Sequence, residues 1–130
     1  MRKWLEYFVI FFGSVCCLIA LAHIALGPKS IPGAIPVNAT MDSEDRFYAT
    51  LFLGFGIALI WCARALHEAE RIRVFGFLLL VFFFSGVARI ISWAMVGPPI
   101  ALFIFLMFVE LLLPPLLWWW HKATLTQQNG

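Results

Sequence analysis

Four long apolar stretches occupy most of this chain, at residues 5–26, 44–64, 74–95 and 99–120. A helix needs about 20 residues to cross a hydrocarbon core of about 30 Å, so each stretch is long enough to span a membrane. The chain is 63% hydrophobic and 12% charged, whereas soluble domains carry about 25% charged residues. We therefore predict an all-α fold, a four-transmembrane-helix bundle. It would form a single domain over residues 1–130, with no room for a separate soluble domain.

The first stretch begins like a secretory signal peptide, with Arg2 and Lys3 before apolar residues. Its apolar run is longer than the 7–15 residues of a signal core, so we expect it to be retained as the first helix. Lys and Arg in the loops and at the ends of the spans favour one side of the membrane, which the positive-inside rule makes the cytoplasm. This predicts cytoplasmic termini and a cytoplasmic loop 64–73. The predicted cytoplasmic side carries Arg2, Lys3, Arg64, Arg71, Arg73 and Lys122, and the opposite side carries Lys29 and Arg46.

The segment 27–42 is the one long loop, and its residues Pro28, Pro32, Gly33 and Pro36 disfavour regular structure. Because several of its other residues are apolar, we expect an interfacial connector at the outer mouth of the bundle, with a lid over that mouth as the alternative. Asp42 is the predicted N-cap of the second helix. Small residues then recur every four positions on that helix and predict a close-packing face. That face would hold Arg46, Thr50, Gly54, Ala58 and Cys62.

Two charges, Arg89 and Glu110, stand inside the third and fourth apolar stretches. A charge near the bilayer centre costs about 2.5–3.5 kcal/mol, so it usually faces a partner or a cavity. At a helical rise, Arg89 would lie about 9 Å and Glu110 about 16 Å below the outer interface. The short turn at 97–99 makes the two helices antiparallel neighbours, so we expect the two side chains to meet.

Other polar groups accompany this pair. Ser85 and Ser92 share the helix face of Arg89, and Gly86 beside them permits close approach of another helix. Pro114 lacks an N–H and leaves the carbonyl of Glu110 without its helical partner, which predicts a kink. His23, Asp45 and Arg46 also fall in the outer half of the membrane. We therefore expect them to converge with Arg89 and Glu110 on one outward-facing pocket.

Several segments resemble a family of bacterial membrane proteins known as domain of unknown function 4345. They are Arg46-Phe47-Tyr48-Ala49, the run Gly86-Val87-Ala88-Arg89-Ile90-Ile91-Ser92, the turn Gly97-Pro98-Pro99, and Glu110-Leu111 ahead of a proline pair. A second glycine often precedes Gly86 in the family, and Ser85 stands there in this chain. The resemblance covers nearly the whole chain and implies a small multi-pass protein of the bacterial inner membrane. It implies no activity. The matching family positions are Arg46, Tyr48, Gly86, Arg89, Ser92 and Glu110.

These residues leave several functional hypotheses open. In the first, the outward pocket binds an anionic or amphiphilic ligand, lipid-like or quinone-like, and the protein acts alone or as an accessory subunit. Arg89 would contact the anion, Glu110 would orient and neutralise Arg89, and Arg46 would stand at the mouth. The ligand-binding residues would be Arg89, Glu110, Arg46, Asp45, Tyr48, Ser85, Ser92 and His23.

A second hypothesis is a membrane enzyme acting on a lipophilic substrate, with Glu110 and His23 as acid–base partners. A third is a proton-coupled transporter, which four helices would support only as a homo-oligomer. A fourth makes the Arg89–Glu110 pair a salt bridge that only fixes helix register in a larger membrane complex. We expect no cofactor, no metal site and no nucleic-acid partner, because no His pair has ligand spacing and no basic patch exists.

Overall fold

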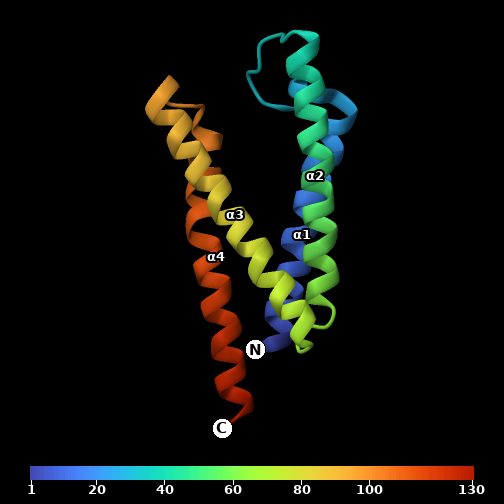
Figure 1. Cartoon of the computed structure of the whole chain (residues 1–130), viewed down its shortest axis with the longest axis vertical. Coiled ribbons are helices and arrows are strands. Elements are labelled where there is room, and N and C mark those ends of the chain that lie inside the picture. The colour runs from blue at the N-terminus through green and yellow to red at the C-terminus, as the bar shows by residue number, and fades with distance from the viewer. The chain divides into compact units, whose positions relative to one another are not determined.

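The computed structural model describes residues 1–130 and is entirely helical. Four long helices follow one another, and each is long and apolar enough to cross a membrane (Figure 1). The predicted all-α class with four membrane-length helices is therefore confirmed. The elements are α1 (Arg2–Leu26), the 3-10 helix η1 (Gly27–Ser30), α2 (Ala39–Ala63), α3 (Ala69–Val96) and α4 (Ala101–Gln128).

The helices extend beyond the apolar stretches at several ends. Helix α2 begins at Ala39, where Asn38 is the N-cap and its side-chain oxygen accepts a hydrogen bond from the Met41 amide at 2.9 Å. The prediction of Asp42 as the N-cap was wrong, since Asp42 lies in the first turn. Helix α4 continues through both prolines to Gln128, so the polar tail that follows the last apolar stretch is mostly helical.

The chain divides into two compact units, and each is described by itself. The α1–α2 unit comprises residues 6–66, and the α3–α4 unit comprises residues 1–5 and 67–130.

In the α1–α2 unit, glycine brings the two helix backbones together. A methyl group placed on Gly56 would lie 2.7 Å from both the Gly13 carbonyl oxygen and the Cys17 sulfur. Only glycine therefore fits at Gly56, and Phe12 and Phe55 meet edge to face beside this contact. The predicted packing face of α2 was wrong at Gly54, which is exposed and has open space where a Cβ would stand.

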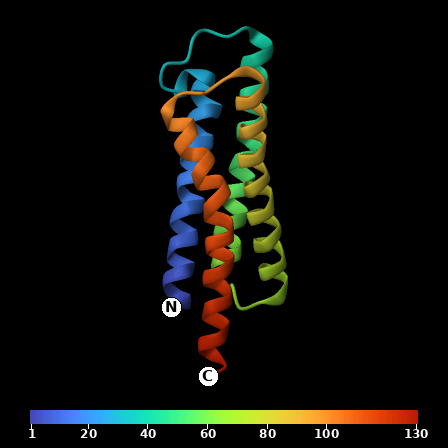
Figure 2. The ribbon, with the colours of Figure 1, turned by 90° about the vertical axis from the view of Figure 1, so that its left-hand side faces the viewer.

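In the α3–α4 unit, the two helices are antiparallel neighbours, as the sequence predicted (Figures 1 and 2). The turn between them begins at Gly97, whose φ of 125° is accessible to glycine and strained for other residues. The buried apolar side chains of this unit are Leu5, Phe75, Leu78, Leu79, Phe82, Met107 and Leu117.

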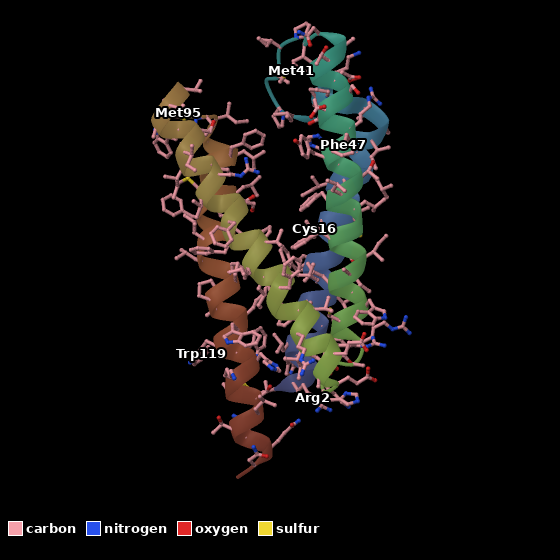
Figure 3. The ribbon with its side chains drawn as sticks, in the orientation of Figure 1. Arg2, Cys16, Met41, Phe47, Met95 and Trp119 are labelled. Carbon is pink, nitrogen blue, oxygen red and sulfur yellow. The ribbon has the colours of Figure 1, made fainter.

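Three tryptophans of α4, Trp118, Trp119 and Trp120, lie away from the hairpin turn of the α3–α4 unit. Met95 lies near the hairpin turn, and Trp119 lies toward the other end of α4 (Figure 3). The Lys122 ammonium stands over the Trp118 ring at 5.4 Å. Tryptophan with a nearby cation is typical of a helix crossing the membrane–water interface.

Candidate functional site

Arg89 of α3 and Glu110 of α4 form the ion pair that the sequence predicted. The Arg89 Nε atom donates a hydrogen bond to the Glu110 Oε2 atom at 2.8 Å. Their exposure is unequal, since the Glu110 side chain is 9% exposed and the Arg89 side chain 34%. The pair therefore combines a carboxylate enclosed by the helices with a guanidinium that reaches outward.

Two neighbours hold this pair in place. At Gly86 a methyl group would lie 2.9 Å from Leu111 Cγ and 3.1 Å from Glu110 Cβ, so glycine lets α4 approach α3 at the level of Glu110. The Phe103 ring lies 5.0 Å from the centre of the Arg89 guanidinium, a distance suited to a cation–π contact. Arg89 is thus positioned by a carboxylate at its Nε and by an aromatic ring.

The two serines near Arg89 differ in hydrogen bonding and in exposure. The Ser85 hydroxyl donates to the Phe82 carbonyl of its own helix, which uses its one donor. Ser92 is exposed on the same helix.

His23 of α1 and Asp45 of α2 form a second pair. The His23 Nδ1 atom lies 2.9 Å and 3.1 Å from the two carboxylate oxygens of Asp45. The two side chains are 21% and 22% exposed. A carboxylate at Nδ1 favours the tautomer with its proton there, which leaves Nε2 available to accept a proton. This arrangement is chemically suited to acid–base work.

Arg46 has a structural role that the sequence analysis missed. Its Nε atom donates to Asp42 at 2.9 Å, and its Nη1 atom donates to the Ile24 and Ala25 carbonyls at 2.6 Å and 3.2 Å. Those carbonyls belong to the last turn of α1, where a cation satisfies unpaired oxygens and the negative end of the helix dipole. The i, i+4 spacing of Asp42 and Arg46 was the available signal for this ion pair.

Tyr48, a further predicted site residue, is exposed on α2, and its ring meets that of Phe47 edge to face at 5.4 Å. Figure 3 labels Phe47 on this helix.

The predicted residues therefore form two groups. Arg89, Glu110, Ser85 and Ser92 belong to the α3–α4 unit, and His23, Asp45, Arg46 and Tyr48 belong to the α1–α2 unit. Convergence of the two groups on one pocket, and the acid–base partnership of His23 with Glu110, stay predictions. The structure contains no group of three or more His, Cys, Asp or Glu side chains arranged to hold a metal ion.

Comparison with protein-family models gives a match to one family, described as "Domain of unknown function (DUF4345)", over residues 4–121. The chain belongs to this family. No curated protein and no solved structure matches the chain. Both the Arg89–Glu110 pair and the His23–Asp45 pair fall within the matched residues. The family description assigns them no activity.

Proposed function

We propose that this multi-pass membrane protein binds an amphiphilic, lipid-like or quinone-like ligand in a bacterial inner membrane, with Arg89 as the polar contact. The observation that carries the proposal is the partial use of the Arg89 guanidinium. Its Nε–H is bound to Glu110, and neither terminal nitrogen makes a hydrogen bond within the chain. An arginine carries five N–H donors, so four remain on those terminal nitrogens.

N–H donors that lack a hydrogen-bond partner raise the free energy of a protein in an apolar solvent. A polar group transferred into such a medium without a hydrogen bond costs at least about 1–3 kcal/mol. Lipid tails offer no acceptor, so an exposed guanidinium edge on a membrane helix favours a bound group with oxygen acceptors. Phosphate and carboxylate groups match the planar fork of arginine with two parallel hydrogen bonds.

Glu110 sets the kind of ligand that suits this edge. Because its carboxylate lies 2.8 Å from Arg89, it offsets most of the positive charge while leaving the terminal donors free. A site of low net charge accepts a quinone carbonyl as well as an anionic head group. Helices α3 and α4 are apolar over most of their length, which suits the ligand's hydrocarbon part.

A register-fixing salt bridge is the main competing explanation. Such a pair gains most when both partners are enclosed and their remaining donors are satisfied by the protein. Here Glu110 is enclosed, but Arg89 is 34% exposed and bonded to the protein through one nitrogen. The unequal burial favours a site that is open on the arginine side. The same open edge in an accessory subunit would meet a polar group on a partner protein.

Native mass spectrometry of the protein extracted directly into lipid nanodiscs tests the proposal. Wild type is compared with Arg89→Ala and with the control Arg73→Ala, which removes an exposed arginine from the same helix. We expect a discrete non-protein mass on wild type and on the control, and its absence from Arg89→Ala. If all three proteins carry the same bound mass, or only bulk lipid, the proposal is wrong and the pair serves helix register.

A further inference from the structure

A pocket of about 430 Å³ lies under the Pro-rich loop of the α1–α2 unit. Its walls come from the end of α1 and η1, from loop residues 34–37, and from the first turns of α2. A volume of this size falls within the range of about 300–1,000 Å³ that is usual for small-molecule sites. The loop and the adjoining helix ends therefore border a hollow of ligand size that is open to its surroundings, and all of its lining residues belong to the α1–α2 unit.

The charged groups in this pocket leave one cation without a partner. Asp42 and Arg46 line it and are bound to each other at 2.9 Å. Lys29 also lines it, and its ammonium group makes no ion pair or hydrogen bond within the chain. The pocket therefore carries a net positive charge that comes from Lys29. The amides of the first turn of α2, beginning at the pocket residue Ala39, add the positive end of a helix dipole.

The other walls of the pocket are apolar, from Leu26 at the end of α1 to Ile35, Pro36 and Val37 in the loop. Three of these are large apolar side chains exposed to solvent: Leu26, Ile35 and Val37. An apolar wall beside a single unpaired cation is complementary to a molecule with one negative group and a hydrocarbon part.

The position of the pocket along the chain indicates what kind of molecule can reach it. The first candidate span ends at Ser30 and the second begins at Ala39, so the pocket lies where the chain leaves and re-enters the membrane. Lipid head groups occupy that level, and one basic side chain there favours anionic over neutral lipid by about fivefold.

We propose that this pocket binds the head group of an anionic phospholipid, with Lys29 as the contact to the phosphate and the Pro-rich loop as the apolar cover. The proposal does not rest on ligand binding at Arg89. The two sites use residues of different units and are tested with different variants.

The test is a lipid titration of the full-length protein in detergent, followed by native mass spectrometry. The probes are phosphatidylglycerol and phosphatidylcholine with the same acyl chains, and glycerol phosphate as the head group alone. We expect wild type to bind phosphatidylglycerol about fivefold more tightly than phosphatidylcholine. Lys29→Ala should abolish this preference. The control Lys122→Ala, which removes an exposed lysine from α4, should retain it.

A second variant tests the pocket without touching its charge. Ala34 lines the pocket, so Ala34→Trp should fill it and weaken phosphatidylglycerol binding. Ser43→Trp, which adds the same bulk at an exposed position outside the pocket, should bind as wild type does. Equal loss in Lys29→Ala and Lys122→Ala, or unchanged binding by Ala34→Trp, would overturn the proposal. Glycerol phosphate binding as tightly as the lipid would overturn the assignment to a phospholipid.

Discussion

Glu110 lies in an environment that is unfavourable for a charged side chain. It is 9% exposed, it lies beside the close contact at Gly86, and its one hydrogen-bonded partner is Arg89. Exposed ion pairs such as Arg71–Glu68, where the Glu68 side chain is 50% exposed, contribute at most about 1 kcal/mol because water screens them. The two pairs should therefore respond differently to removal of the acid.

We expect Glu110→Ala to lower the free energy of unfolding by about 3 kcal/mol, because it leaves Arg89 without its counter-charge in an apolar environment. Glu68→Ala, the matched loss of an acid from an exposed pair, should cost less than about 1 kcal/mol. Unfolding by SDS in mixed micelles measures both. Equal stability of the two variants would show that Arg89 is well solvated without Glu110.

The Arg89–Glu110 pair was predictable, whereas the roles of His23, Asp45 and Arg46 were not. A charge inside an apolar stretch has few possible partners, and the short turn at 97–99 leaves α3 and α4 one way to pair. The capping of α1 by Arg46 depends on where the ends of α1 and α2 meet across the long loop. Hydropathy does not determine that register, so the contact of Arg46 with the Ile24 carbonyl could not be predicted.

At the scale of the helices, the packing of α1 on α2 depends on which glycine faces the neighbour. Gly54 and Gly56 are two residues apart, which places them about 200° apart around the helix. The small residues at every fourth position predicted that the helix face carrying Gly54 packs against a neighbour. The structure places Gly56 against the Gly13 carbonyl instead. Side-chain size alone indicates that a close-packed face exists, and it does not identify which face meets the partner.

We expect Gly56→Ala to destabilise the protein by about 1–3 kcal/mol, because its methyl group would overlap the Gly13 carbonyl oxygen and the Cys17 sulfur. Gly54→Ala is the control in the same helix. It meets open space, so it should be neutral or slightly stabilising through better helix propensity. Thermal unfolding in detergent compares the two, and an equal effect of both variants would contradict this packing.

At the scale of the whole molecule, hydropathy predicted four membrane-length helices because lipid leaves few options for the backbone. Every N–H and C=O group must be paired inside the segment that crosses, so a long apolar run becomes a helix whatever its neighbours are. Helix ends are less constrained. Helix α4 runs to Gln128, eight residues beyond the apolar stretch that ends at residue 120. The side of the membrane that each end faces stays a prediction from the distribution of Lys and Arg.

In the proposed function, the Arg89–Glu110 pair serves a ligand and is not required for the fold. The most direct test is the bound non-protein mass of the double variant Arg89→Leu with Glu110→Leu, read by native mass spectrometry in nanodiscs beside its unfolding free energy. Replacing a buried ion pair by apolar side chains of similar size is often neutral or stabilising. We therefore predict a double variant as stable as wild type to within about 1 kcal/mol that has lost the bound mass. A double variant that keeps the bound mass, or one as unstable as Glu110→Ala, would contradict a ligand-binding role for this pair.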